Sequence, residues 1–142
     1  MKTNQTVFRQ INNLTHQLKR CFNIYFDNIG ITGVQASILH FIMIESKYRD
    51  VFQKDIEEEF KVRRSSATNI LQVLEKGQYI RRETIAYDAR LKKIVLTAKT
   101  IELDKIIMEH IVKINERMLQ NIPSDKLQDF QEVLSEMSRN LD

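Results

Sequence analysis

The spacing of apolar residues changes in one part of this chain, and that change limits the folds the chain can adopt. From Val7 to Lys76, and again from Ala98 to Leu141, apolar residues recur every three or four positions, the period of a helix with one buried face. Between Tyr79 and Leu96 they form two short β-branched runs around a polar tip at 87–90, as in a hairpin with a longer loop. Three glycines and one proline leave few helix breakers. We predict a mainly α fold of four helices, a small β-hairpin and two further helices.

Local signals indicate where these helices begin and end. Gly30 is suited to end the first helix, and Thr32 with Gln35 forms a capping box that opens the second. Gly77 is expected to supply a left-handed exit from the fourth helix. Ser124, which follows the only proline, is expected to cap the last helix.

Several classes of protein are disfavoured by what the sequence lacks. No apolar run approaches the roughly 20 residues that span a bilayer, and the first ten residues contain no apolar signal core. Cys21 is the single cysteine, so no intramolecular disulfide can form, which fits a reducing cytoplasm. We therefore expect a cytoplasmic protein that is not a membrane protein.

Catalytic and metal-binding patterns are also missing. His16, His40 and His110 form no cluster in the sequence, and Glu109-His110 lacks the second histidine one turn later that a helical zinc site needs. There is no nucleophile elbow, phosphate loop or His-Glu-x-x-His motif. The sequence therefore predicts no enzyme, no metal and no cofactor.

Positive charge is concentrated in one third of the chain. The segment from Lys61 to Lys93 contains nine basic and three acidic residues, a net charge of +6, whereas the remainder carries 13 basic and 16 acidic residues, a net charge of −3. Such asymmetry is typical of a face that binds a polyanion.

The third and fourth helices have the layout of a helix-turn-helix motif. A helix near 53–60 is joined by a short connection to a helix near 64–76, and the second helix of such a motif enters the major groove. Arginine can bind guanine, asparagine can bind adenine, and hydroxyls bind bases or phosphates. The predicted DNA-reading residues are Arg63, Arg64, Ser65, Ser66, Thr68 and Asn69. Taken alone, this pattern also fits an ordinary capped and solvated helix start.

The hairpin favours the DNA-binding interpretation. A basic tip that follows a recognition helix can reach the adjoining minor groove, where Arg90 is the residue we expect. Asp88 can orient an arginine side chain by a charge-assisted hydrogen bond. Lys92 and Lys93 are expected to contact the phosphate backbone.

These motifs together resemble a known family. In order, the chain shows Thr-x-x-Gln at 32–35, a Ser/Thr-rich recognition helix, Leu-Glu-Lys-Gly at 74–77, Arg-Arg at 81–82, Asp-x-Arg at 88–90 and Leu-Thr at 96–97. This pattern resembles the MarR family of bacterial winged helix-turn-helix transcriptional regulators, specifically from about residue 29 to 97. Four positions depart from the family pattern around the third helix and after the wing: Phe52, Glu57, Lys61 and Thr100.

The resemblance implies an architecture and a function. Residues 1–30 would form a dimerisation helix, 31–97 the winged helix-turn-helix, and 98–142 further dimerisation helices, in one integrated fold. A homodimer would bind double-stranded DNA at an inverted-repeat operator and repress a nearby operon until a small-molecule ligand, aromatic or other, or an oxidant releases it. The alternative from another class is a winged-helix protein-interaction module that binds no DNA.

The dimer also has support from the residues themselves. The first helix and the last two carry long apolar stripes, and the rest of the chain is too small to cover all three, whereas a two-fold interface would cover them. One self-contained helical bundle is the alternative.

Control by an effector is implied only by the resemblance. Relatives bind effectors between the dimer helices and the winged motif, a crevice that here would be lined by Phe22, Tyr25, Phe26, Phe41 and Tyr48, although these aromatics also fit a plain core. Cys21 fits an oxidant-sensing thiol or a buried structural thiol, and its position along the helix favours the structural role.

Overall fold

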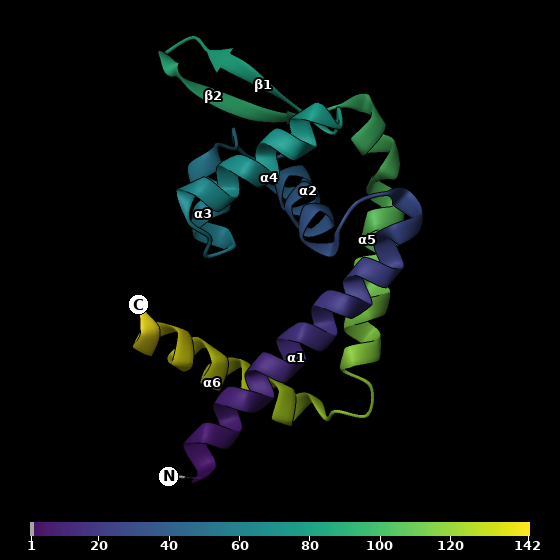
Figure 1. Cartoon of the computed structure of the whole chain (residues 1–142), viewed down its shortest axis with the longest axis vertical. Helices are drawn as coiled ribbons and strands as arrows, with labels where there is room; N and C mark the ends of the chain where they lie inside the picture. The colour runs from purple at the N-terminus through teal and green to yellow at the C-terminus, as the bar shows by residue number, and fades with distance from the viewer. Residues whose placement is uncertain (1) are drawn as a thin grey trace. The chain divides into compact units, whose positions relative to one another are not determined.

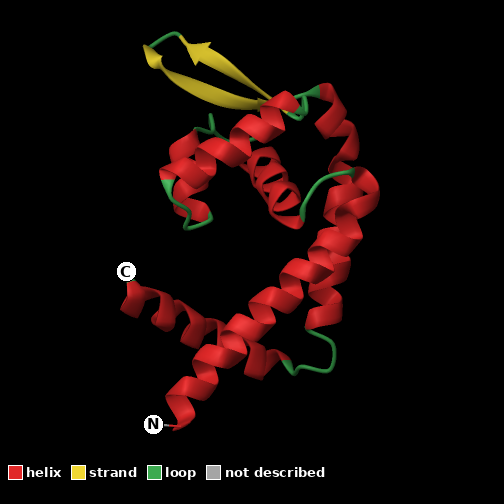
Figure 2. Ribbon diagram, viewed as in Figure 1, coloured by secondary structure: helices red, strands yellow, loops and turns green. Residues whose placement is uncertain are grey.

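The computed structural model describes residues 2–142 (Figure 1). Helices α1 (Lys2–Phe26), α2 (Gly33–Glu45), α3 (Gln53–Glu59) and α4 (Arg64–Lys76) come first, and a 3-10 turn at Asp27–Ile29 follows α1. An antiparallel hairpin of β1 (Ile80–Ile85) and β2 (Asp88–Leu96) comes next, followed by α5 (Ala98–Met118) and α6 (Ser124–Leu141). The predicted order of elements and the mainly α fold with a hairpin wing are confirmed (Figure 2).

The chain forms two compact units, Met1–Val112 and Lys113–Asp142. The core of the first unit is mainly aliphatic and draws on α2, α3, α4, the hairpin and the first part of α5, together with Phe26 at the end of α1. Each fully buried aliphatic side chain contributes about 1.5–3 kcal/mol. Its most deeply buried members include Ile38, Leu39, Ile42, Ile56, Leu71, Leu74, Ile80 and Ile107. No helix among residues 2–142 is long and apolar enough to cross a membrane.

The corner between α1 and α2 is built by two glycines and a capping box. Gly30 has a φ of +82°, a left-handed conformation that favours glycine, and its N–H donates to the Asp27 carbonyl. The predicted capping box is present, because the Gln35 N–H donates to Thr32 Oγ1 at 3.2 Å and the Thr32 N–H donates to Gln35 Oε1 at 2.9 Å. A Cβ at Gly33 would lie 2.3 Å from the Phe22 Cβ, so only glycine allows α1 to cross α2 this closely.

The tight turn between α3 and α4 tolerates the residues that depart from the family pattern. Lys61 adopts a left-handed φ of 51°, so a non-glycine residue occupies a conformation that glycine would adopt without strain. The Val62 N–H donates to the Glu57 carbonyl at 3.1 Å and closes the turn. At the start of α3, Phe52 offers no capping side chain, and the Asp55 carboxylate instead accepts the Phe52 N–H at 2.8 Å.

The structure corrects three local predictions. Gly77 does not supply the left-handed exit from α4, because it keeps a φ of −75° and Gln78 takes the left-handed φ of 62°. Glycine is required at 77 for space, since a Cβ there would lie 2.9 Å from the Tyr79 ring. Ser124 is the first residue of α6 rather than its cap, and Pro123 occupies the cap position without a side-chain hydrogen bond.

The third correction concerns the hairpin. Ile85 pairs with Asp88, so the connection is the two-residue turn Ala86–Tyr87 and not a longer loop. Thr84 pairs with Lys92, which leaves residues 89–91 between two consecutive pairs as a three-residue bulge in β2. Bulges of this kind bend a strand and re-aim its side chains. The polar tip predicted from sequence is therefore mostly strand, with its irregularity on one side.

Two threonine hydroxyls connect the end of α4 to the start of α5. Thr97 Oγ1 donates to the Gln78 carbonyl at 2.7 Å, and the buried Thr100 Oγ1 donates to the Tyr79 carbonyl at 2.7 Å. Both carbonyls belong to the turn that leaves α4, and the Tyr79 carbonyl also accepts from the Thr97 N–H at 3.1 Å. Thr100, which replaces the glycine common in the family, therefore completes the hydrogen bonding of this turn.

Candidate nucleic-acid interface

The first turns of α4 present a polar face while the opposite face is buried. Ala67, Leu71 and Leu74 are at most 1% exposed and fix the helix against the core. The predicted contact residues on the other face are exposed: Arg63, Arg64, Ser65, Ser66 and Asn69. Arg63 is the cap residue, so the unpaired backbone N–H groups of the first turn lie beside it, as in sites that favour phosphate.

Thr68 differs from its neighbours because its hydroxyl is already engaged. Thr68 Oγ1 donates to the Arg64 carbonyl at 2.8 Å and accepts from the Gln53 side-chain amide at 2.8 Å. Its one proton is therefore used within the protein, and only an acceptor position remains for a base.

The side chain of Arg90 in the wing is exposed to solvent. Arg90 lies in the three-residue bulge with its side chain 90% exposed. The predicted contact with Asp88 is present: Asp88 Oδ1 accepts from Arg90 Nε at 3.2 Å and from the Arg90 backbone N–H at 3.0 Å. The guanidinium is thus restrained in direction while remaining available to an external anion.

The two wing lysines have different surroundings. Lys92 is exposed, whereas Lys93 is half-buried, with its Nζ 3.9 Å from Asp50 Oδ1. The same part of the strand is joined to the α2–α3 connection, because the Ile94 N–H donates to the Val51 carbonyl at 2.7 Å. To contact a phosphate, Lys93 must therefore either break its ion pair with Asp50 or contact both groups at once.

The acidic residues of the basic segment lie next to its arginines. Glu75 is 3.6 Å from Arg82 Nε, and Glu83 is 3.3 Å from Arg81. Asp88 pairs with Arg90 as described above. Each of these three acids therefore lies beside an arginine that is outside α4. The first turn of α4 contains no acidic residue.

The five aromatics predicted to line an effector crevice are not brought together within the chain. Phe22 and Phe26 stack on one another, with ring centroids 6.3 Å apart. Tyr25 and Phe26 contact the His110 ring of α5 at 5.5 and 5.3 Å. Phe41 packs edge-on against Phe60, and Tyr48 is 83% exposed beyond the end of α2.

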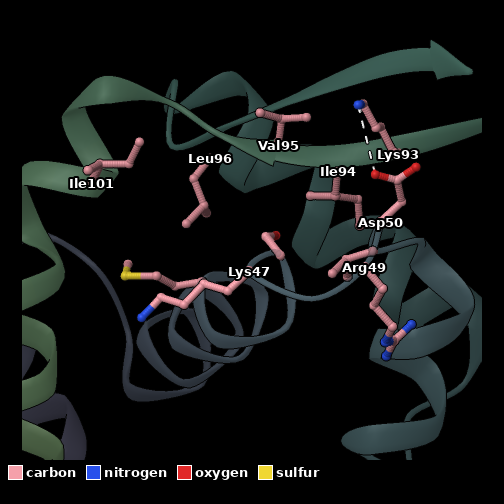
Figure 3. Close-up of a pocket in the computed structure, with 11 residues that line it drawn as sticks. Lys47, Arg49, Asp50, Lys93, Ile94, Val95, Leu96 and Ile101 are labelled. Atoms are coloured by element: carbon pink, nitrogen blue, oxygen red, sulfur yellow. Dashed lines mark ion pairs between the residues drawn. The ribbon is translucent and has the colours of Figure 1, made fainter.

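A pocket lies elsewhere, between the end of α2, the base of β2 and the first turn of α5. Figure 3 shows this pocket, with the ion pair of Lys93 and Asp50 at one edge. Its volume is about 350 Å³, and its apolar wall is formed by Met43, Val51, Ile94, Val95, Leu96 and Ile101.

Cys21 is half-buried on α1. Among the described residues, no three His, Cys, Asp or Glu side chains are grouped closely enough to hold a metal ion.

Two residues that belong to none of the predicted motifs, Gln53 and Arg49, make contacts at the start of α3. Gln53 contacts Thr68, and Arg49 contacts Asp55 at 2.9 Å beside the start of α3. Neither belongs to a motif with a recognised spacing, so the only signal in the sequence is a polar residue next to a helix start.

Comparisons with known proteins agree with this geometry. A model of the MarR family matches residues 29–91, which include the helix-turn-helix and most of the wing. No curated protein matches the chain in sequence. The solved structure of the transcription regulator MarR from Oenococcus oeni PSU-1 is 26% identical, with a TM-score of 0.83 over 94% of this chain and 98% of that one.

Two further structures are similar in fold at lower identity. MepR of S. aureus in complex with DNA is 21% identical, with a TM-score of 0.83 over 96% of both chains. A MarR family regulator from Listeria monocytogenes, complexed with a 26mer DNA, is 19% identical, with a TM-score of 0.83 over 94% of this chain and 87% of that one. The family match identifies residues 29–91 as a winged helix of the MarR family, and the nearly full-length likeness to the Oenococcus regulator gives the chain the fold of a MarR-type DNA-binding transcriptional regulator.

Proposed function

We propose that this regulator binds an inverted-repeat operator as a homodimer, with α4 in the major groove and the wing in the adjoining minor groove. The observation that carries the proposal is the exposed first turn of α4, followed by a wing whose Arg90 is restrained by Asp88 and 90% exposed. Two proteins that share the fold are solved in complex with DNA, which supports DNA binding by this chain.

The roles of the side chains follow from their chemistry. Arg63 and Arg64 bind bases or phosphates, and Arg90 reads the minor groove, where a narrow groove concentrates negative potential. Lys92 and Lys93 contact the phosphate backbone. The residues that face the major groove are Ser65, Ser66, Thr68 and Asn69, and Thr68 enters as an acceptor because its proton is used within the protein.

A homodimer is supported by apolar surface that each unit leaves uncovered. On α1, Phe8 is 67% exposed, and Ile11 and Leu14 are more than 40% exposed. On α6, Phe130 and Val133 are each 49% exposed, at helical spacing along one face. Residues 1–30 and 98–142 would supply the interface, and 31–97 the DNA-binding part. Sedimentation that gives a monomer at micromolar concentration would contradict this part of the proposal.

The regulator acts in the bacterial cytoplasm as a repressor that an effector releases. Such an effector would bind beside the winged motif and favour a different spacing of the two winged motifs in the dimer. Operator affinity would then fall by an amount set by how much more tightly the effector binds that spacing than the DNA-binding one. Oxidation at Cys21 would give a sulfenic acid, or a disulfide with a thiol of another molecule, because residues 1–142 contain a single cysteine. We favour ligand release because Cys21 is half-buried, and exposure makes a thiol more susceptible to oxidation.

The experiment that tests the proposed function is a salt titration of duplex binding. A DNA-binding face with several phosphate contacts loses affinity steeply as salt rises, with a slope of log K against log salt of about −0.9 per contact. A flat response, or no duplex binding at low salt, would favour the alternative of a winged-helix protein-interaction module. Selection of bound sequences from a random duplex pool then supplies the operator.

A further inference from the structure

Gln53 is the first residue of α3, and it joins the starts of the two helices of the helix-turn-helix. Its side-chain amide Nε2 donates to Thr68 Oγ1 at 2.8 Å and lies 3.4 Å from the Arg64 carbonyl. The Thr68 hydroxyl in turn donates to that same carbonyl at 2.8 Å. One side chain of α3 therefore contacts two groups in the first five residues of the helix that faces DNA.

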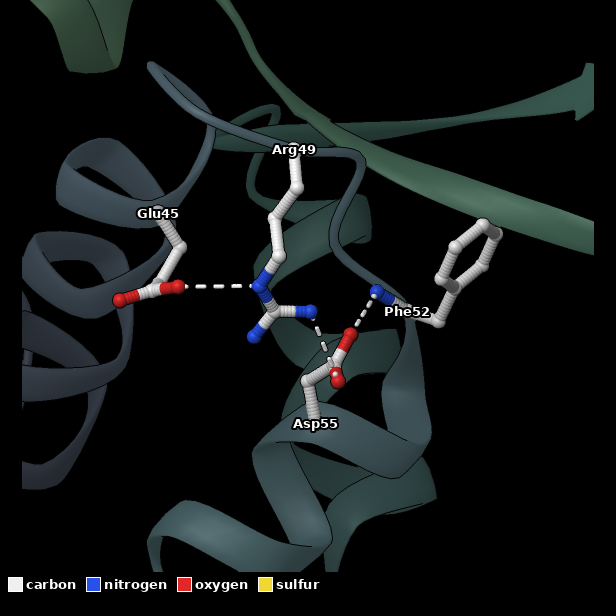
Figure 4. Close-up of polar contacts among 4 residues, drawn as sticks. All are labelled: Glu45, Arg49, Phe52 and Asp55. Atoms are coloured by element: carbon white, nitrogen blue, oxygen red, sulfur yellow. Dashed lines mark hydrogen bonds and ion pairs between the residues drawn. The ribbon is translucent and has the colours of Figure 1, made fainter.

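The end of α3 that carries Gln53 is itself fixed by charged side chains. Figure 4 shows the Arg49 guanidinium between two carboxylates, 3.0 Å from Glu45 Oε2 and 2.9 Å from Asp55 Oδ1. The other oxygen of Asp55 accepts the Phe52 N–H, which is the backbone group directly before Gln53. These contacts connect the end of α2 to the start of α3, and they raise the pKa of Arg49, first through Asp55 and then through Glu45.

The hydrogen bond between Gln53 and Thr68 is separate from the hydrophobic packing of the helix-turn-helix. Ala67 and Leu71 are fully buried and hold α4 against the core, but apolar packing of this kind is not directional. A hydrogen bond at Thr68 is directional, so it is suited to fix the rotation of the first turn and with it the direction of the neighbouring Ser65 and Asn69 side chains.

We propose that Gln53 is a positioning residue for sequence readout, which fixes the rotation of the first turn of α4 through the Thr68 hydroxyl. The proposal rests on the proposed DNA-binding function. It assigns Thr68 a structural part in specificity through Gln53, in addition to the acceptor position that its hydroxyl keeps for a base. Non-specific affinity, which depends on phosphate contacts, is unaffected.

The test compares Gln53→Ala, Thr68→Val, the double variant and Thr68→Ser in the full-length protein. The readout is the ratio of affinities for the duplex selected by the wild-type protein and for a random duplex. Both single variants should lower this ratio by about tenfold, and the double variant should lower it no further, since the two residues act as one unit. Thr68→Ser keeps the hydroxyl and should retain the wild-type ratio. Gln128→Ala, an exposed glutamine on α6, is the matched control.

Two results with DNA would overturn the proposal. If Thr68→Val lowers the ratio and Gln53→Ala does not, Thr68 acts without Gln53. If Gln53→Ala weakens binding to both duplexes equally and reduces the salt slope, Gln53 is a phosphate contact.

A second measurement does not depend on DNA binding. Hydrogen exchange of the backbone amides of residues 67–69 should be faster in Gln53→Ala than in the wild-type protein and in Gln128→Ala. If the wild-type protein binds no duplex, the proposed function fails, and hydrogen exchange still decides whether Gln53 restrains the start of α4. Unchanged exchange would show that Gln53 does not restrain α4.

Discussion

Asp88 holds Arg90 through both its backbone and its side chain, since Asp88 Oδ1 accepts the Arg90 N–H at 3.0 Å and the Nε–H at 3.2 Å. The arginine side chain stays 90% exposed, so the pair adds little to stability; exposed ion pairs contribute about 0–1 kcal/mol. The contact reduces the number of rotamers that the free Arg90 side chain samples. If Arg90 enters the minor groove as proposed, less conformational entropy is lost on binding.

Arg90→Ala should weaken operator binding by about 1–3 kcal/mol and leave the melting temperature unchanged, because the side chain is exposed and contacts only Asp88 within the wing. A fluorescence anisotropy titration with the selected duplex measures this loss. The control is Arg139→Ala, which removes an arginine paired with Glu136 on α6. Wild-type affinity in Arg90→Ala would show that the wing does not contact the operator.

Arg63→Ala and Arg64→Ala should each reduce the salt dependence of duplex binding. Each arginine that contacts a phosphate accounts for about one unit of the slope of log K against log salt, so the double variant should lose about two. Binding isotherms between 50 and 200 mM salt, roughly the range in which such slopes are read, give the value. An unchanged slope in the double variant would remove the first turn of α4 from the phosphate contacts.

His40→Phe should make stability less dependent on pH. Burial lowers the pKa of His40, Asp104 opposes this shift, Lys47 adds to it, and Nδ1 is buried without a partner among the described residues. The unfolded chain therefore takes up this proton at a higher pH than the folded protein does. The contribution to stability is fully present above the unfolded pKa of about 6.5 and is lost as the pH falls through the folded pKa.

Urea unfolding at several pH values from neutrality down to the onset of carboxylate titration measures this effect. The midpoint of the wild-type protein should fall with pH, and that of His40→Phe should fall less. His16→Phe changes an exposed histidine on α1 and should keep the wild-type dependence. Equal pH dependence in all three proteins would mean that protonation of His40 is not opposed by folding.

Thr100→Val should destabilise the protein by about 1–2 kcal/mol, because it replaces a buried hydroxyl that donates to the Tyr79 carbonyl at 2.7 Å. The loss is moderate because the Thr97 N–H still donates to the same carbonyl at 3.1 Å. Thr84→Val, at an exposed position of β1, is the matched control. A midpoint of chemical unfolding equal to that of the wild-type protein would assign no stabilising role to the Thr100 hydroxyl.

The features that sequence predicted correctly depend on residues close together in the chain. The order of the elements follows from apolar periodicity, and the Thr32 and Gln35 capping box is a contact across three positions. The prediction for Gly77 is wrong because glycine is needed there to leave space for the Tyr79 ring. A turn propensity describes backbone conformation and carries no information about that space. The contact of Gln53 with Thr68 crosses 15 positions, and only the crossing of α3 and α4 brings the two residues together.

The wing shows a different limit of sequence-based prediction. A polar run at 87–90 predicts a loop, but the backbone of Asp88 pairs with Ile85 and the strand begins there. Strand pairing is a property of the backbone, so polar side chains do not prevent it. The position of Arg90 in a bulge follows from where pairing resumes at Lys92, and the residue types alone do not specify that position.

The hydroxyls of Thr97 and Thr100 have a consequence for the choice of operator. They join the turn after α4 to the first turn of α5. We therefore expect a change in the direction of α5 to move the end of α4 with it. In the proposed dimer, the distance between the two copies of α4 must match the roughly 34–36 Å between half-sites one helical turn apart. Which half-site spacing this protein accepts would then depend in part on two threonines that need not contact DNA.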